Sequence, residues 1–298
     1  MEIVKFENHN QEAVVHSYLS GLDIAGKTKE NYLGVLSAFL SWYGREGQRM
    51  SENILIRYKE HLQGQHKPLT VNFHLVPVRS FLNFLHDKNI IPFKPSVRLL
   101  PRPNGHLRDA FSVDQVKAIL GAIPLDTLEG LRNYAIINLM ARTGLRVKEI
   151  INADIEDIRT RNNKTVLYVL GKYRAQKDEF VVLNNRAYDP IREYLAAREY
   201  SKGKSPLFSV HSNRNLNGKM SSRTVRHMIQ GYIKLAGIKN GKLSAHSFRH
   251  FCASESLAAG ADLVSVSRML RHRDIRTSQV YLHYKNRTDN PAEERIVF

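Results

Sequence analysis

The sequence predicts a mainly α-helical protein with a small antiparallel β-sheet, divided into two domains. Three observations predict this fold class. Apolar residues recur at helical spacing over the first ninety residues, a proline-rich stretch follows, and two β-rich runs interrupt an otherwise helical second half. A chain of 298 residues accommodates two domains of ordinary size. We therefore predict a helical domain over residues 1–95, a linker over 96–108 and a second domain over 109–298.

The first domain is expected to contain short amphipathic helices. Apolar residues fall at three- and four-residue intervals in three stretches, which we predict to be buried: 32–43, 54–62 and 73–85. The third stretch includes Phe73 and Val76, and Pro77 inside it is expected to kink the helix. The basic residues between these apolar stripes fit either contact with a polyanion or simple solvation: Lys27, Lys29, Arg57, Lys59, Lys67 and Arg79.

Helix-breaking and helix-capping residues mark where the first domain ends and the second begins. Residues 91–107 contain four prolines and a glycine, which disfavour both helix and central strand, so an extended basic linker is expected. Beyond it, Ser112 and Gln115 have the spacing of a capping box at a helix start. A more apolar helix over 131–141 is expected to end at Gly144.

A β-hairpin is predicted within the second domain. The runs 165–170 and 179–183 are rich in β-branched and aromatic residues, and the polar, basic stretch 171–178 separates them. The rest of the domain returns to helical patterns, with Gly260 as a further helix stop.

The charge balance is the first indication of function. Lysine and arginine number 45 against 28 aspartates and glutamates, a net charge of +17. This surplus points to a polyanionic partner, and the alternative is a basic protein kept soluble by its charge.

Cys252 is the single cysteine, so an internal disulfide is excluded and a reducing compartment is expected. No apolar stretch has the length of a membrane span or a signal peptide, so we expect a cytoplasmic protein.

Six residues in four segments of the second domain are candidates for chemistry: Arg146, Lys172, His246, Arg249, His272 and Tyr281. Taken singly, each is weak evidence. An arginine after a helix stop usually forms a cap or a salt bridge, a lysine in a hairpin turn is usually solvated, and a lone histidine or tyrosine is ordinary in a core. Their order along the chain carries the argument.

That order resembles the tyrosine recombinase family, the phage-integrase and Xer group. The family's catalytic domain presents an arginine in a TGLR-x-x-E segment, a lysine between two strands, an H-x-x-R pair, a histidine or tryptophan, and a tyrosine. This chain has TGLRVKE, a hairpin lysine, HSFRH, LRH and TSQVYLHY in the same order. The resemblance covers about residues 110–284 and implies that a helical core-binding domain precedes it.

Two positions depart from the family pattern. Phe248 stands where the family usually has leucine, which is an apolar exchange. Arg271 stands where the family usually has glycine before the third-position histidine, and it places an additional cation beside the site.

The resemblance implies a site-specific recombinase that forms a C-shaped clamp on double-stranded DNA. Tyr281 would attack a backbone phosphate to give a 3′-phosphotyrosyl intermediate, and strands would exchange through a Holliday junction. A homotetramer on paired recombination sites is implied, alone or with a second recombinase or accessory protein. The reaction would serve DNA integration and excision or dimer resolution, with no cofactor, metal or ATP.

The residue types suit this chemistry. Negative charge develops on the phosphate oxygens in the transition state, and Arg146 and Arg249 are the expected clamp because a guanidinium donates two parallel hydrogen bonds. Glu149, one turn beyond the first arginine, has an expected orienting or structural role. Tyr281 has an ordinary pKa near 10, so it needs a base, for which His246 is the best candidate.

The remaining candidates would handle the phosphate and the leaving group. His272 is expected to donate a hydrogen bond to the phosphate, and Lys172 to protonate the departing 5′ oxygen. Tyr284 is a rival nucleophile, but the family places its tyrosine nine residues after the third-position histidine, which matches Tyr281. His246 and His250 have a spacing that suggests zinc, yet Ser247 replaces the glutamate that the zincin pattern requires.

Two other functions compete with recombination. A type IB topoisomerase-like enzyme would use a similar constellation to relax DNA without a specific site. A non-enzymatic helix-turn-helix regulator would use 258–270, but it has no reason to hold four of the candidates in this order: Arg146, Lys172, Arg249 and Tyr281. Residues 296–298 form an apolar end with no local core, so we expect the C-terminal segment 292–298 to dock on a neighbouring protomer. A chain that begins directly with the helical domain favours a compact recombinase without an additional arm-binding domain.

Overall fold

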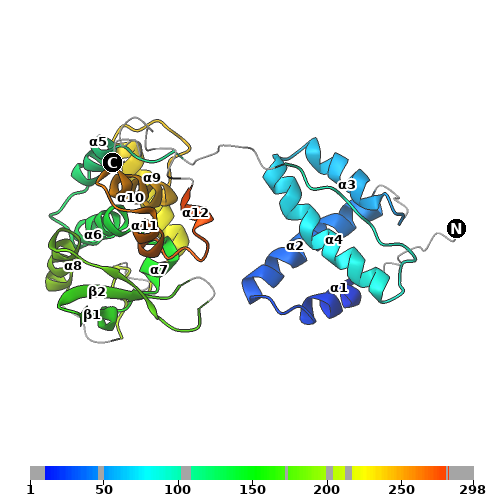
Figure 1. Ribbon diagram of the computed structural model, residues 1–298, viewed down its shortest axis with the longest axis horizontal. Coiled ribbons are helices and arrows are strands. Elements are labelled where there is room, and N and C mark those ends of the chain that lie inside the picture. Colours follow the sequence, from blue (N-terminus) through cyan, green and yellow to red (C-terminus); the bar gives the residue numbers. More distant parts are fainter. Residues whose placement is uncertain are drawn as a thin grey trace, which may run out of the picture. The chain divides into compact units, whose positions relative to one another are not determined.

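The chain folds into two compact units, Met1–His106 and Leu107–Phe298 (Figure 1). The computed structural model describes residues 11–45, 50–101, 109–171, 174–198, 204–211, 217–279 and 281. The described part is mainly helical and contains one three-stranded antiparallel sheet, which confirms the predicted fold class. None of the helices within these ranges is both long and apolar enough to cross a membrane.

The first unit is built from four helices: α1 (Gln11–Ser20), α2 (Gly26–Arg45), α3 (Ile54–Gln63) and α4 (Pro68–Asp87). Helix α4 contacts the other three, so it is the centre of this unit. Its buried face runs through Leu75, Val78 and Leu82, one helical turn apart. Pro77 lies within the helix, which continues past it to Asp87.

The prediction for the third apolar stripe was partly wrong. Phe73 is 51 % exposed and Val76 is 36 % exposed, whereas Val71, Leu75 and Val78 are fully buried. The stripe 71, 75, 78, 82, 85 keeps helical phase throughout, and a stripe that starts at Phe73 does not. An apolar residue alone does not reveal which side of a helix faces the core.

The segment predicted as a linker begins as part of the first unit. Val97 is buried in its core, and Asn72 on α4 exchanges two hydrogen bonds with the backbone of Leu100, at 2.8 and 2.9 Å. Lys59 Nζ also donates to the carbonyl of Arg98 at 2.9 Å. Prolines exclude regular structure here, but they do not prevent an extended chain from packing. Residues 102–108 of the predicted linker lie outside the described residues.

The second unit surrounds helix α6 (Leu128–Thr143), which is buried around most of its circumference and contacts α5, α8 and α10. The other helices in the described part are α5 (Val113–Gly121), α7 (Val147–Ile151), α8 (Asn185–Ala197), α9 (Ser222–Leu235), α10 (Ala245–Ala258), α11 (Leu263–Met269), α12 (Arg276–Gln279) and the 3₁₀ turn Ile155–Asp157. The predicted capping box is confirmed, since Ser112 Oγ accepts from the backbone of Gln115 and the Gln115 side chain accepts from the backbone of Ser112.

The sheet has the order β1-β2-β3, with β1 (Ile158–Arg161), β2 (Lys164–Val169) and β3 (Glu179–Val182), all antiparallel. The predicted hairpin is β2 and β3, paired from Val166↔Val182 to Val169↔Glu179. Strand β1 was missed because it is short and mostly exposed. In Figure 1 the sheet lies at one end of the unit, and α5 and α9 lie toward the other.

Candidate active site

The TGLR segment joins a helix stop directly to a helix start. Gly144 caps α6 with φ of +61°, and a Cβ at this position would lie 2.6 Å from Leu270 Cδ2. Glycine is therefore required for its conformation and for its lack of a side chain. Two residues later Arg146 caps α7, where its backbone N–H donates to Glu149 Oε2 at 2.8 Å and its Nη1 donates to Oε1 at 2.6 Å. These contacts are consistent with the orienting or structural role predicted for Glu149.

Arg249 is buried at the centre of the site on α10. Its side chain reaches the TGLR segment, because Nη1 donates to the carbonyl oxygen of Gly144 at 2.7 Å and Nη2 donates to that of Leu270. Burial first, and then the nearby Arg146 and Arg271, lower the pKa of Arg249 to about 9. The guanidinium remains charged at neutral pH, yet its surroundings favour the arrival of an anion.

Glu149 is the buried carboxylate that holds two arginines together. Its side chain and that of Arg271 are each 2 % exposed, and Arg271 Nη2 lies 2.8 Å from Glu149 Oε2. Burial acts to raise the pKa of Glu149, but Arg271 and then Arg146 outweigh it and hold that pKa below its ordinary value. Arg146, Arg249 and Arg271 with this one carboxylate leave a net charge of +2, which suits a phosphate.

Arg271 occupies an unusual backbone conformation. It ends α11 in a Schellman arrangement, in which its N–H donates to Arg268 O at 2.9 Å and the N–H of His272 donates to Ser267 O at 3.1 Å. Its φ of +55° is left-handed, which costs an L-residue about 1–2 kcal/mol. The sequence predicted an additional cation here, but neither the left-handed backbone nor the pair with Glu149 was foreseen.

His272 follows immediately and is held by a buried serine. Its Nδ1 lies 2.7 Å from Ser278 Oγ, and Ser278 is fully buried. Burial, and next the positive charges of Arg249, Arg146 and Arg271, lower the pKa of His272 to about 4. The imidazole is therefore neutral at pH 7, and its Nε2 carries the proton in the tautomer in which the Ser278 hydroxyl donates to Nδ1.

Tyr281 lies in a small apolar cluster that includes Leu257, Val266 and Leu270, and is 2 % exposed. Its ring centroid is 5.4 Å from that of His250, whose ring lies 4.9 Å from that of His246. Sequence reasoning considered His250 only as a zinc ligand, and its contact with Tyr281 was missed. The i, i+4 spacing on α10 aligns the two histidines on one side of the helix.

Electrostatic interactions connect five of the six predicted residues. Arg249 interacts with Arg146 and Tyr281, and His272 interacts with Arg249 and His246. These residues come from the start of α7, from α10 and from the segment after α11, so the fold gathers positions up to 135 residues apart in the sequence.

Lys172, the sixth residue, lies outside the described residues, as do Tyr284 and the C-terminal segment 282–298. The described residues that follow Lys172, 174–178, include an ion-paired lysine. Lys177 Nζ binds Asp154 Oδ2 at 2.8 Å and also binds Asp157. Burial alone would lower the pKa of Lys177, but the hydrogen bonds to these two carboxylates raise it.

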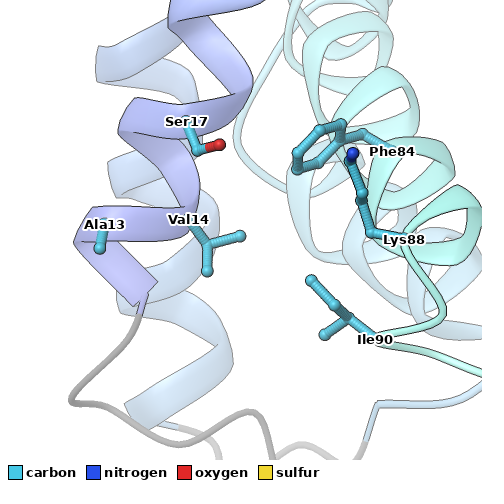
Figure 2. Close-up of a pocket in the computed structure, with 6 residues that line it drawn as sticks. All are labelled: Ala13, Val14, Ser17, Phe84, Lys88 and Ile90. Carbon is cyan, nitrogen blue, oxygen red and sulfur yellow. The ribbon is translucent and has the colours of Figure 1, made fainter.

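Other features of the described chain do not extend this constellation. Within those residues, no group of three or more His, Cys, Asp or Glu side chains is arranged to hold a metal ion. A pocket of about 400 Å³ lies in the first unit between α1 and the end of α4 (Figure 2). It is lined by Ala13, Val14, Ser17, Phe84, Lys88 and Ile90, most of which are apolar.

Comparison with known proteins agrees with the geometry. The phage integrase family matches residues 110–287. Tyrosine recombinase XerD of Rickettsia prowazekii is 32 % identical over 224 residues, covering 72 % of this chain and 71 % of the relative. Tyrosine recombinase XerD of Vibrio cholerae is 31 % identical over 271 residues, covering 87 % and 86 %.

Solved structures show the same fold. The XerH site-specific recombinase bound to palindromic difH substrate, in a post-cleavage complex, has a TM-score of 0.75 at 16 % identity and covers 99 % of this chain and 91 % of its own. A lambda integrase dimer bound to a core site has a TM-score of 0.70 at 15 % identity, covering 94 % and 96 %. With these similarities and the site geometry together, the chain belongs to the phage integrase family and is a tyrosine recombinase of Xer type.

Proposed function

We propose that this protein cuts and rejoins double-stranded DNA at specific sites through a covalent bond between Tyr281 and a 3′ phosphate. The observation that carries the proposal is the cluster of three arginines around one buried carboxylate, in electrostatic contact with Tyr281. A net positive site beside a tyrosine suits phosphodiester exchange, in which an anionic transition state forms next to the nucleophile.

Arg146 and Arg249 bind the non-bridging oxygens of the scissile phosphate. Arg146 is partly exposed, with 28 % of its side chain accessible, and it is held from behind by Glu149. The terminal nitrogens of Arg249 each bond a carbonyl oxygen and each carry a second hydrogen for the phosphate. His272, neutral because of its lowered pKa, donates from Nε2 as a third group.

Proton transfer completes each half of the reaction. His246 accepts the phenolic proton of Tyr281 as the oxygen attacks phosphorus, and the packed ring of His250 holds both side chains in line. Lys172 gives a proton to the departing 5′ oxygen. The phosphotyrosyl bond retains the energy of the broken phosphodiester, so religation requires no ATP. The arginines supply the positive charge, so the reaction proceeds without a metal ion.

Recombination needs more than one protomer. XerH was solved bound to its difH substrate, and we propose that this chain likewise binds a duplex that carries a specific site. Four protomers pair two sites and exchange strands through a Holliday junction, alone or with a second recombinase or accessory protein. The same chemistry serves integration, excision and dimer resolution, and we expect it to occur in the cytoplasm.

The C-terminal segment is proposed to dock on a neighbouring protomer. Deleting residues 288–298 should therefore impair the pairing of sites more than DNA binding, and unchanged recombination by the truncated protein would contradict this docking role.

The test is covalent trapping. A duplex selected from a random library for tight binding is nicked within the bound region, so that the cleaved strand loses a short fragment and cannot religate. Wild-type protein in EDTA should give a protein–DNA adduct on a denaturing gel, and Tyr281→Phe should not. Tight binding without any adduct would favour the helix-turn-helix regulator instead. Relaxation of a plasmid without the selected site would favour the topoisomerase-like alternative.

A further inference from the structure

The additional arginine beside the site has a specific task. We propose that Arg271 is a positioning residue for strand cleavage, which holds the buried carboxylate of Glu149 and through it orients the guanidinium of Arg146 toward the scissile phosphate. This inference rests on the proposed function of the site. It concerns a residue that does not itself touch DNA.

Accessibility separates the two arginines. The side chain of Arg271 is 2 % exposed, whereas that of Arg146 is 28 % exposed. A phosphate on a duplex can therefore reach Arg146 directly. Arg249 is as buried as Arg271, but its terminal nitrogens bond neutral carbonyl oxygens, so its charge remains available to a phosphate, whereas the charge of Arg271 is paired with Glu149. Whatever Arg271 contributes to the reaction must pass through a group that it contacts inside the protein.

Glu149 is that group. Its Oε1 accepts from Arg146 Nη1 at 2.6 Å, while its Oε2 accepts from the backbone N–H of Arg146 and from Arg271 Nη2, both at 2.8 Å. The carboxylate is thus held on one oxygen and binds the functional guanidinium with the other. Among the charges that lower the pKa of Glu149, that of Arg271 is the largest, so Arg271 also keeps the carboxylate ionised.

The backbone of Arg271 supports a dedicated role. A φ of +55° suits glycine, so an arginine here depends on its side-chain contacts to remain in place. Two contacts provide this: Nη1 donates to the carbonyl of Met269 at 2.6 Å, and Nη2 donates to Glu149. The bond to Met269 holds the side chain against the end of α11. The bond to Glu149 connects the segment before His272 to α7.

Loss of Arg271 would leave the Glu149 carboxylate hydrogen-bonded to Arg146 and without its partner from the end of α11. The carboxylate would then bind Arg146 with both oxygens or take up a proton, and either change moves the guanidinium away from its orientation toward the phosphate. Misplacement by about 1 Å lowers a rate by about 10²-fold. Because the DNA-binding surface is untouched, affinity should stay the same while the rate falls.

The experiment measures single-turnover cleavage of the nicked duplex. Arg271→Met should lower the rate at saturating protein by about 10²-fold and change the half-saturating protein concentration less than about twofold. Arg268→Met is the matched control, since it removes one positive charge from an exposed residue of the same helix. It should cleave at the wild-type rate. Arg271→Gly is a second test, because glycine adopts the left-handed backbone at this position without strain. It should cleave as slowly as Arg271→Met, which would show that backbone strain in the methionine variant is not the cause of the lower rate.

A double-mutant cycle identifies the route of the effect. In a Glu149→Gln background, Arg271→Met should lower the rate less than about threefold further, because the group through which it acts is already altered. Multiplicative losses in the double variant would overturn the proposal, as would wild-type cleavage by Arg271→Met. If the wild-type protein itself forms no adduct, the proposed function fails and this inference fails with it.

Discussion

Gly144 and Arg249 are joined by a hydrogen bond of 2.7 Å, from Nη1 of the arginine to the carbonyl oxygen of the glycine. This bond links the end of α6 to α10 at a position where only glycine fits. The buried arginine is therefore oriented by the backbone of the segment that also presents Arg146. The geometry of the phosphate clamp depends on a glycine that has no chemistry of its own.

Replacing that glycine should damage both stability and cleavage. Gly144→Ala places a methyl group 2.6 Å from Leu270 Cδ2 on a left-handed backbone, so the free energy of unfolding should fall by about 2–4 kcal/mol. Gly231→Ala on α9 is the control, because its Cβ would meet nothing within 4 Å, and it should preserve or raise stability by up to about 1 kcal/mol. Urea unfolding and the cleavage assay measure both effects. Equal stability of the two variants would contradict the steric argument.

We expect that lysine cannot substitute for Arg249 in strand cleavage. Arg249→Lys keeps a positive charge but cannot bond two carbonyl oxygens and a phosphate together, so cleavage should fall by about 10³-fold. Arg192→Lys provides the comparison, since Arg192 is exposed on α8 and paired with Asp189 at 2.8 Å. Single-turnover cleavage rates of the two variants are the measurement. A fall in the rate of Arg249→Lys by less than about tenfold would show that the positive charge alone suffices.

His272 should make stability depend on acidic pH. Its pKa is 6.5 in an unfolded chain and about 4 in the folded protein, so the unfolded state binds the proton first as the pH falls. The free energy of unfolding should therefore decrease from about pH 6.5 to about pH 4 and then level off for this group. His272→Asn removes the titration, so its unfolding curve should depend less on pH over that range. Parallel curves for the two proteins would mean that His272 is not the group responsible.

Lys172 can be tested through the leaving group. Lys172→Ala should slow cleavage by about 10²–10⁴-fold on normal DNA, because the 5′ oxygen then departs without a proton. A substrate with sulfur at the bridging 5′ position leaves as a stable thiolate and needs no acid. On that substrate, the variant should cleave within about threefold of the wild-type rate. An equal defect on both substrates would remove Lys172 from the role of acid.

Local signals in the sequence predicted much of the fold. The capping box at Ser112, the stop at Gly144 and the β2–β3 hairpin were all found because each depends on a few neighbouring residues. Strand β1 was missed because its apolar content is low, although Asn162 and Asn163 with positive φ form the type of turn that joins such strands. The error at Phe73 arose because helical phase is set by the packing partners.

The choice of the candidate site residues rests on their order in the sequence, whereas their contacts could not be predicted from it. The order of Arg146, Arg249 and Tyr281 along the chain pointed to them, because the chemistry fixes their types. The pairing of Arg271 with Glu149 joins positions 122 residues apart and depends on the way α11 ends, which no local pattern encodes. The contact of Ser278 with His272 has the same origin in the tertiary fold.

The nucleophile can be identified directly in the trapped adduct. Trypsin cleaves after Arg276 and Lys285, so Tyr281 and Tyr284 fall on one peptide, 277–285. After nuclease digestion of the bound strand, fragment-ion mass spectrometry locates the remaining nucleotide on this peptide. The account predicts that the nucleotide is attached to Tyr281 in wild-type protein and that no modified peptide forms in Tyr281→Phe. A nucleotide on Tyr284, or on any residue outside this peptide, would contradict it.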